Sequence, residues 1–459
     1  MKVIIENTVC LNTGDAAILM AIRHILRSAF GHDLKFLVFD SQPDVSRRLY
    51  PSPAYGDIEF RRLISETVFK YSHGTGSFKD AAKPLYNKLL LKLLRIFSDG
   101  SLSKFGLISK RDRNNIQAYR DADMVITTGG TYLVETYNLE KRLNQFELDD
   151  ILGKTPIFFT QSLGPFRNPT NRQRLKQAFD KSELILLRDA HSKDNISEVV
   201  ADIEKCHVVA DSVFALADTA RIQAVLSAPA GSGTGVVAIS VRNWNYVKDG
   251  ENGMGRYIDS IRAMATVLVR AYGKKVVFVS TCQGVPEYAH DDSKTAKAIY
   301  ARLDPDVAAN TSVDDGFHSP EQLMAMVKGF DFVVATRMHM MIMSLCVGTP
   351  VLPIAYEFKT KELSARLGIA ELTLDINTVT AAKATEILAG FVSGLEQYRQ
   401  TSLSSVLEEH ASAMSVVEPL KQAFARLAAK RSGYVLPAGQ QVAPRGGVNQ
   451  SQNQSDAVV

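Results

Sequence analysis

Along most of the chain, short apolar runs rich in β-branched residues alternate with longer segments that have the apolar spacing of helices. Such alternation predicts parallel sheets that are covered by helices on both faces. Nine runs have the composition of buried strands and are, in order, "KVIIE", "LKFLVF", "DMVITTGG", "PIFFTQS", "ELILLR", "VVAISVR", "KVVFVST", "DFVVATR" and "PVLPIAY". The pattern therefore predicts an α/β protein.

The predicted strands form two groups, which are separated by a stretch of small residues ending in "SAPAGSGTG". This division predicts two Rossmann-like domains that face each other across a cleft. Ligands of such domains bind beyond the carboxyl ends of the strands, so functional side chains are expected in the cleft. The predicted parts are an N-terminal domain 1–216, a linker 217–234, a C-terminal domain 235–400, a helical segment 401–432 and a tail 433–459 too poor in apolar residues to fold, hence disordered.

Composition and charge exclude several classes of protein. With 459 residues, of which 46% are hydrophobic, the chain is long enough to bury more than one core. A net charge of +4, without an arginine-rich arm or a zinc-ligand spacing, does not indicate nucleic-acid binding. The four cysteines lie far apart, which favours a reducing compartment over a disulfide framework. Because "MKVIIENTVC" has the pattern of a strand and no run approaches the roughly 20 apolar residues that span a bilayer, we expect a cytoplasmic protein.

Residues 61–120 differ from the rest of the chain because lysine and arginine recur there with few acids. Within them, "KPLYNKLLLKLLRIF" sets cations beside a strongly apolar helical pattern. This pattern fits a lid over an anionic substrate, or a peripheral contact with the anionic inner face of a membrane. It also fits an inserted helix that packs on the first domain and keeps its lysines in water.

The junction "DFVVATRMHMMIMSLCVG" carries the strongest candidate site. Arg337 falls at the carboxyl tip of a predicted buried strand, and His339 falls in the first turn of a predicted helix that ends near Gly348. A helix N-terminus attracts phosphate or carboxylate, and arginine adds a two-pronged donor. A bound phosphate would favour protonated His339 and so make it a proton donor. In the alternative interpretation, Arg337 pairs with a carboxylate and His339 caps the helix.

Three further side chains are candidates, each with an alternative. Lys359 follows the next predicted strand and would lie near the same anion, unless it is a solvated helix residue. Arg242 ends the first strand of the second domain, where it would bind another oxyanion of the ligand or form a surface salt bridge. Asp15 begins an amphipathic helix of the first domain, either as its N-cap or as a base or hydroxyl ligand that faces the cleft.

Other polar positions carry weaker signals. "TTGGTYL" and "FTQSLGPF" both place glycines after a strand, and these glycines either admit a ligand close to the backbone or simply make turns. Arg188 and Asp211 have no partner that sequence spacing reveals, so we interpret both as structural. The histidines are scattered, and the local cluster "HDDSK" is typical of a helix cap, so no metal site is expected.

Seven stretches, taken in order, resemble the motif series of the bacterial polysaccharide pyruvyl transferases: "NTGDAAIL", "TTGGTYL", "TQSLGPF", "LLRDAHS", "ADSVFAL", "ISVRNW" and "ATRMHMMIMSLCVGTPVLPIAYEFK". The resemblance runs from about residue 3 to residue 370, and the closing R-x-H…G-x-P…Y-x-x-K is its most specific part. The chain departs from the family pattern at Thr131, where a third glycine is frequent, and in the basic insertion 61–120.

The resemblance implies a fold similar to the two-domain GT-B glycosyltransferases. It also implies transfer of pyruvate from phosphoenolpyruvate, as a ketal, to paired sugar hydroxyls of a bacterial exopolysaccharide or its lipid-linked precursor, without a cofactor. This donor carries a phosphate and a carboxylate, and its enol carbon must gain a proton, so the reaction needs several cations and a proton donor. The residues that match the motifs are His339 and Asp15 as catalytic residues, and Arg337, Lys359, Arg242, Gly14 and Gln161 as substrate-binding residues.

Two other functions compete with this interpretation. A nucleotide-sugar glycosyltransferase or epimerase would share the fold. Such enzymes, however, commonly have a glycine-rich diphosphate loop and a ribose-binding glutamate where this chain has "TRMHMMIMS". A non-catalytic membrane- or polymer-binding function would account for the basic segment 61–120, but it assigns no role to Arg337 and His339.

Overall fold

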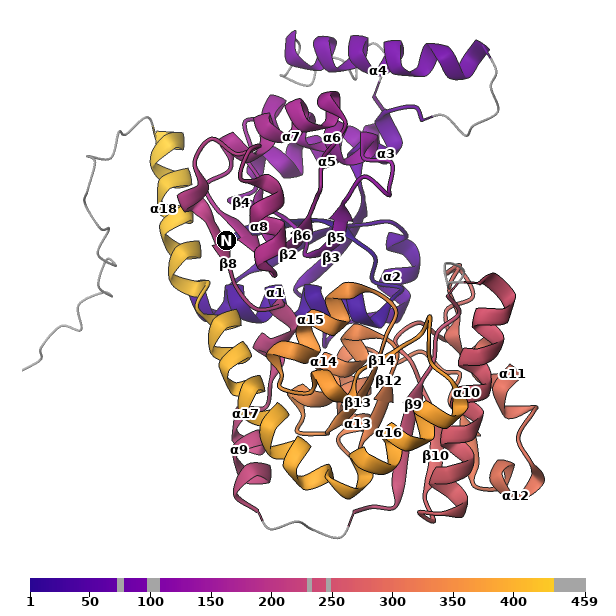
Figure 1. Ribbon diagram of the computed structural model, residues 1–459. Helices are drawn as coiled ribbons and strands as arrows, with labels where there is room; N and C mark the ends of the chain where they lie inside the picture. Colours follow the sequence, from indigo (N-terminus) through magenta and orange to yellow (C-terminus); the bar gives the residue numbers. More distant parts are fainter. Residues whose placement is uncertain (72–77, 97–107, 229–232, 245–248, 433–459) are drawn as a thin grey trace, which may run out of the picture.

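The computed structural model describes the chain apart from residues 72–77, 97–107, 229–232, 245–248 and 433–459. The predicted disordered tail 433–459 therefore lies outside the described residues. Within the described part, two separate parallel sheets form the centres of two α/β halves, one above the other in Figure 1.

The first sheet has eight strands in the order β3-β2-β1-β4-β6-β7-β8, with β5 paired to β6 beside this path. Its register is parallel throughout, so that Val3 lies opposite both Phe36 and Met124. Parallel pairing brings the carboxyl ends of the strands to one edge of the sheet. The strands are β1 (Lys2–Thr8), β2 (Lys35–Asp40), β3 (Ile58–Arg62), β4 (Met124–Thr127), β5 (Gly130–Leu133), β6 (Ile157–Leu163), β7 (Ile185–Leu187) and β8 (Cys206–Val208).

The second sheet has six parallel strands in the order β11-β10-β9-β12-β13-β14. Its central strand β9 pairs with β10 and β12, and the apolar residues of these strands are almost fully buried because helices cover both faces. The strands are β9 (Val236–Ser240), β10 (Lys275–Phe278), β11 (Thr311–Val313), β12 (Val333–Ala335), β13 (Val351–Ala355) and β14 (Leu374–Asp375).

All nine strands predicted from sequence are present, whereas five others were not predicted. Four of the missed strands, β3, β8, β11 and β14, are the edges of the two sheets. Edge strands are short and partly solvated, so they lack the continuous apolar run that marks a buried strand. The fifth, β5, follows directly after the β4 run and includes a glycine with a positive φ of 113°, Gly130.

Eighteen α-helices within the described residues connect and cover the strands. Those before β9 in the chain are α1 (Thr13–Phe30), α2 (Pro43–Leu49), α3 (Ile64–Val68), α4 (Phe78–Ile96), α5 (Lys110–Asp121), α6 (Glu140–Ile151), α7 (Pro169–Lys181), α8 (Ala190–Ile196) and α9 (Thr219–Ser227). Those after β9 are α10 (Gly250–Arg270), α11 (Asp292–Tyr300), α12 (Pro305–Ala308), α13 (Pro320–Val327), α14 (Met338–Cys346), α15 (Phe358–Arg366), α16 (Ala381–Ser393), α17 (Leu395–Met414) and α18 (Val417–Ser432).

The segment predicted as a linker, 217–234, is partly helical. Helix α9 occupies Thr219–Ser227, and Asp218 caps it by accepting a hydrogen bond from the backbone N–H of Arg221. The small residues that suggested a linker come only after this helix. The terminal helices α17 and α18 then run back along one side of the molecule, where α17 packs on α9 and α18 packs on α1 (Figure 1).

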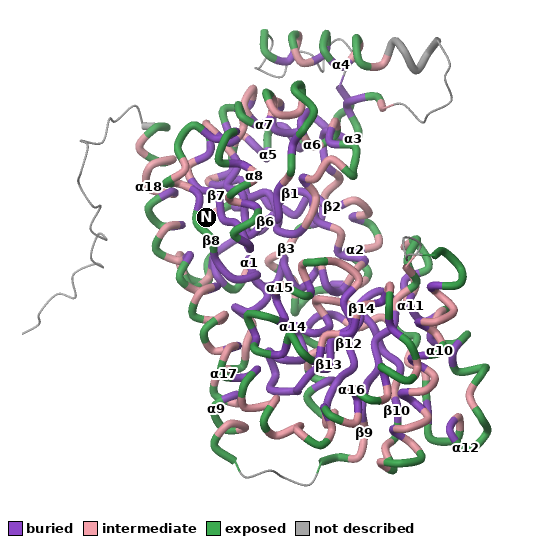
Figure 2. The backbone as a smooth tube through the Cα atoms, in the orientation of Figure 1, coloured by how far each residue is buried: buried purple, intermediate pink, exposed green. Residues whose placement is uncertain are grey.

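Helix α1 lies between the two halves. It packs on α13 and α14 of the second half as well as on α18, and most of its residues are buried (Figure 2). A helix that is buried on most sides is apolar around most of its circumference. The largely apolar sequence of α1 therefore reflects its packing against both halves. The backbone N–H of Thr13 also donates to the carbonyl of Thr281 at 2.9 Å, which fixes the start of α1 against the second half.

A pair of buried carboxyl groups lies inside the first half. Glu6 accepts hydrogen bonds from the Tyr119 hydroxyl and from Gln145, whose amide also donates to Asp149. One oxygen of each carboxyl group has no protein partner. Burial raises the pKa of Glu6 to about 7, because water no longer solvates its charged form.

Candidate active site

A cavity of about 690 Å³ lies between the two halves. Its walls come from the start of α1, the connection between β5 and α6, and the segments that follow β9, β12 and β13. Only two carboxyl groups, Asp15 and Glu357, are among its lining residues. The cavity therefore suits an anionic ligand, because it is lined by six lysine or arginine residues: Lys141, Arg142, Arg188, Arg242, Arg337 and Lys359.

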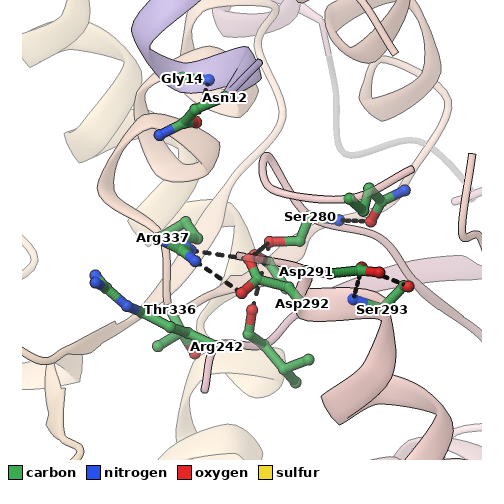
Figure 3. Close-up of polar contacts among 12 residues, drawn as sticks. Asn12, Gly14, Arg242, Ser280, Asp291, Asp292, Ser293, Thr336 and Arg337 are labelled. Carbon is green, nitrogen blue, oxygen red and sulfur yellow. Dashed lines mark hydrogen bonds and ion pairs between the residues drawn. The ribbon is translucent and has the colours of Figure 1, made fainter. Parts of the chain in front are cut away.

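Arg337 directly precedes α14, as predicted, and points toward a buried carboxylate (Figure 3). Its Nε and Nη2 donate to the two oxygens of Asp292 at 2.8 and 2.7 Å. Asp292 also accepts from the Ser280 hydroxyl at 2.6 Å, and its side chain is only 2% exposed. The carboxylate pair of the alternative interpretation is therefore present, and Arg337 also lines the cavity as the main interpretation requires. The "HDDSK" cluster is a helix cap as predicted, through Asp291.

His339 lies in the first turn of α14 and lines the cavity. It does not cap the helix, because α14 has no side-chain cap. Its Nε2 is buried and has no hydrogen-bond partner among the described residues. It lies 3.8 Å from Asp211, which is too long for a hydrogen bond but short enough for electrostatic attraction. Burial alone would raise the pKa of Asp211, but the positive charges of His339 and Arg188 outweigh it and hold that pKa well below its usual range.

The other side of the His339 ring packs against Gly14 of α1. A Cβ atom added to Gly14 would lie 2.7 Å from Nδ1 and 2.9 Å from Cβ of His339, which is closer than atoms approach. Glycine is therefore required here for close contact between the two helices. Gly14 was predicted to bind substrate, but the structure instead gives it the role of a spacer that seats His339.

Asp15 follows in the first turn of α1 and faces the cavity. The N-cap of α1 is Asn12 rather than Asp15, since the Asn12 side chain accepts from the backbone N–H of Gly14 at 2.9 Å. Asn12 also donates to Asp15 at 3.0 Å. Burial raises the pKa of the Asp15 carboxyl group, while the charge of His339 and a hydrogen bond from Tyr132 oppose the rise.

Arg188, Thr131 and Lys359 form a chain of contacts across the cleft. Arg188 donates to Asp211 at 2.9 Å and to the Thr131 hydroxyl at 2.7 Å. From the other half, Lys359 also donates to that hydroxyl at 2.6 Å. Burial and the nearby charge of Arg188 lower the pKa of Lys359, which is therefore not a solvated helix residue. Thr131, the departure from the family pattern, thus joins the two halves at the cavity.

Arg242 is held by aromatic rings rather than by a carboxylate. Its guanidinium carbon lies 3.9 Å from the ring centre of Tyr356 and 4.3 Å from that of Trp244. Within the part of the chain that the structure describes, Arg242 forms no ion pair, and its Nε is buried without a hydrogen-bond partner. The surface-salt-bridge alternative is therefore wrong. Arg242 is a lining cation whose charge remains available to a ligand.

Gln161 does not reach the cavity. Its side chain is buried and donates to the backbone carbonyl of Thr128 at 3.0 Å, and it is absent from the cavity lining. The prediction that it binds substrate is wrong for this structure, because Gln161 points into the sheet and braces the turn after β4. The interpretation of Arg188 and Asp211 as structural was also incomplete. Arg188 lines the cavity, and Asp211 lies beside His339.

Several lining residues were not singled out from the sequence, and Arg142 and Tyr132 are among them. Arg142 lies in the first turn of α6, where its spacing among other charged residues resembles a solvated helix face. In the structure it donates to the side chain of Asn7 and lies 5.6 Å from the ring centre of Tyr132. Tyr132 in turn lies close to Asp15, so these residues bring further polar groups to the first-half wall.

Two features of the described residues bear on the class of site. They contain no group of three or more His, Cys, Asp or Glu side chains positioned to hold a metal ion. Among the same residues, no helix combines the length and apolarity that crossing a bilayer requires.

Comparison with known proteins identifies the family. The sequence model of the polysaccharide pyruvyl transferases matches residues 12–357, a range that includes the start of α1, the turns after β4 and β6, and the Arg337–His339 junction. The chain belongs to the polysaccharide pyruvyl transferase family. Family membership confirms the resemblance seen in the motif series and makes the protein a transferase. A similar protein is the amylovoran biosynthesis protein AmsJ of Erwinia amylovora, which is 25% identical over 449 residues, 89% of this chain and 96% of AmsJ.

Solved structures with a similar fold confirm the predicted GT-B-like architecture of this pyruvyl transferase family member. A putative UDP-N-acetylglucosamine 2-epimerase from Listeria monocytogenes matches with a TM-score of 0.54 and 9% identity, over 93% of this chain and 97% of that one. The UDP-GlcNAc 2-epimerase from Neisseria meningitidis matches with a TM-score of 0.50 and 13% identity, over 92% of this chain and 100% of that one. At such low identity the likeness concerns the fold alone.

Proposed function

We propose that this protein transfers pyruvate from phosphoenolpyruvate to two hydroxyl groups of a saccharide and so forms a cyclic ketal. The acceptor is an exopolysaccharide or its lipid-linked precursor. The observation that carries the proposal is the cavity between the two halves, where six lysine or arginine residues are set against two carboxyl groups. Phosphoenolpyruvate is small and bears both a phosphate and a carboxylate, so it needs several cations that converge on one place.

In this proposal Arg242 is the principal ligand of the donor. It lines the cavity, it forms no ion pair among the described residues, and the rings of Trp244 and Tyr356 lie against its guanidinium. The bidentate pair with Asp292 uses two nitrogens of Arg337 and offsets its charge. Arg337 therefore contributes less to the donor than its position at the strand tip first suggested, and the pair orients it toward the cavity.

His339 is the proposed proton donor. Its imidazole lines the cavity, and its Nε2 lies 3.8 Å from the Asp211 carboxylate. The methylene carbon of phosphoenolpyruvate takes a proton from His339 while an acceptor oxygen bonds to the adjacent carbon. The bond from that carbon to the phosphate oxygen then breaks, and a second acceptor oxygen closes the ketal. The two hydroxyl protons end on the new methyl group and on the released phosphate, so the reaction balances without water.

Asp15 is the proposed base for the attacking hydroxyl. It comes from the first half and faces the cavity that His339 lines from the second half. Its raised pKa makes the carboxylate a better proton acceptor than an ordinary aspartate. The proposal thus sets the acid and the donor-binding cation on the second half, and the base on the first half, where the acceptor binds.

The test is to incubate the protein with phosphoenolpyruvate and defined saccharides and to follow two products. We expect each modified saccharide to gain the mass of one pyruvate less one water, with one phosphate released per ketal. Parallel incubations with UDP-sugars test the glycosyltransferase or epimerase alternative. Sugar transfer or epimerisation from UDP-sugars, with no phosphate release from phosphoenolpyruvate, would replace the proposal.

A further inference from the structure

Helix α4, within the basic segment 61–120, presents one face to the protein and another to solvent. Asn87, Leu90 and Leu94 are buried, and the two leucines belong to a hydrophobic cluster with residues of α3, α5 and α6. These three buried residues are spaced three and then four positions apart, so they lie on one face of the helix. Part of the packed-helix interpretation is therefore correct, because α4 packs on the first half through this face.

The opposite face of α4 is apolar and exposed. Leu85 is 72% exposed, Leu89 55% and Ile96 71%. At 100° per residue these three side chains fall in one stripe along the helix. A large exposed aliphatic side chain is ordinary when it stands alone, but a row of them on one helix indicates a contact surface.

Cations border this stripe, and no acid interrupts it. Lys88, Lys92 and Arg95 are exposed beside the leucines, and residues 83–96 contain no aspartate or glutamate. Among the residues that the structure describes, Arg95 is the only one of these cations near a carboxylate, at 3.9 Å from Asp150. The exposed face is thus a hydrophobic stripe with a positive border, the arrangement that lies at the boundary between headgroups and acyl chains.

We propose that the exposed face of α4 docks on an anionic bilayer surface. The side chains of Leu85, Leu89 and Ile96 enter the interface, while Lys88 and Lys92 contact anionic headgroups. A second copy of this chain is a poorer occupant, because a symmetric contact of this face would set its cations against each other. Helix α4 would lie on the surface rather than cross it, since its charged residues make it too polar to span a bilayer.

The packing of α4 also connects this helix, through one intervening residue, to the wall of the cavity. Lys83 of α4 donates to the backbone carbonyl of Tyr71 at 3.0 Å, and the Tyr71 ring centre lies 5.4 Å from Nζ of Lys141. Lys141 lines the cavity from the first half. A membrane contact through α4 would therefore attach the first half, which carries the proposed acceptor side of the cavity, to the bilayer surface.

Vesicle co-sedimentation of the full-length protein tests this inference. Vesicles of phosphatidylcholine with about one third phosphatidylglycerol are compared with phosphatidylcholine alone, at low and high salt. We expect the protein to bind the anionic vesicles at low salt, with binding reduced at least about tenfold by Lys88→Glu/Lys92→Glu and by Leu85→Gln/Leu89→Gln. A matched control, Lys294→Glu/Arg302→Glu, makes the same charge change at exposed sites of the second half and should bind like the unaltered protein.

Several results would overturn the inference. It fails if the unaltered protein does not bind anionic vesicles at low salt, or if either α4 variant binds as well as the control. It also fails if sedimentation shows a dimer that Leu85→Gln/Leu89→Gln dissociates, because α4 would then be an interface between copies. Binding is measured without donor or acceptor, so this outcome is independent of the proposed pyruvyl transfer.

Discussion

The contact between Gly14 and His339 offers a sharp test of the proposed acid. In Gly14→Ala the new Cβ atom would lie 2.7 Å from Nδ1 and 2.9 Å from Cβ of His339. Carbon atoms in contact are normally about 3.5 Å or more apart, so the distances between the new Cβ atom and His339 must increase by roughly 0.6–0.8 Å. Because the His339 Cβ is fixed to the backbone, rotation of the ring cannot relieve the clash, and α14 must shift relative to α1.

The expected effect is on rate rather than on folding. A displacement approaching 1 Å at a reacting group costs up to about 10²-fold in turnover, so kcat should fall by about 10- to 100-fold. Overpacking costs about 1–3 kcal/mol of unfolding free energy, but alanine is favoured over glycine in a helix by about 1 kcal/mol. The net loss of stability should therefore stay below about 2 kcal/mol.

The assay measures phosphate release and ketal formation for Gly14→Ala and for a control, Gly255→Ala. Gly255 lies in α10, and a Cβ atom there would meet nothing within 4 Å. The control should keep full turnover and gain about 0.5–1 kcal/mol of stability. If Gly14→Ala is folded and turns over at the normal rate, then either the seat of His339 does not matter or His339 is not the proton donor.

Three further predictions follow from the same structure. His339→Gln should lower turnover by about 10²–10⁴-fold while the affinity for phosphoenolpyruvate, measured by calorimetry, changes little; loss of affinity alone would make His339 a phosphate ligand instead. Arg242→Gln should weaken donor binding by about 10- to 150-fold, the worth of about 1.5–3 kcal/mol for a charge-assisted hydrogen bond, and unchanged affinity would remove Arg242 from the donor site. Burial raises the pKa of Glu6 from about 4.5 in the unfolded chain to about 7 in the folded state. The contribution of neutral Glu6 to the free energy of unfolding is therefore fully present below pH 4.5 and is lost as the pH rises through 7. Chemical denaturation at pH 4.5 and 8 should show up to about 3 kcal/mol of this loss, which Glu6→Gln should abolish; equal pH dependence in the two proteins would contradict the assignment.

The sequence alone was sufficient for the parts of the fold that depend on local pattern. Buried central strands such as β9 and β12 are continuous apolar runs, and a run followed by an apolar helical segment places Arg337 at a strand tip and His339 in the first helical turn. These features follow from hydrophobic periodicity, which is a property of a few neighbouring residues and can be recognised in the sequence alone. Edge strands such as β3 were not predicted, because their partly solvated residues do not form a continuous apolar run.

The tertiary structure decided which of these residues act together. Arg337 pairs with Asp292, 45 residues earlier, and Lys359 meets Thr131 across 228 residues of chain. Gly14 touches His339 only because α1 is buried between the two halves.

Local pattern could not find these contacts, because it predicts each element but not which elements pack face to face. The sequence by itself therefore determined where cations and a histidine end their strands, through periodicity and strand–helix junctions. Only the packing of two parallel sheets, carboxyl edge toward carboxyl edge, decided that these side chains share one cavity, since the burial that brings them together is a property of the whole fold.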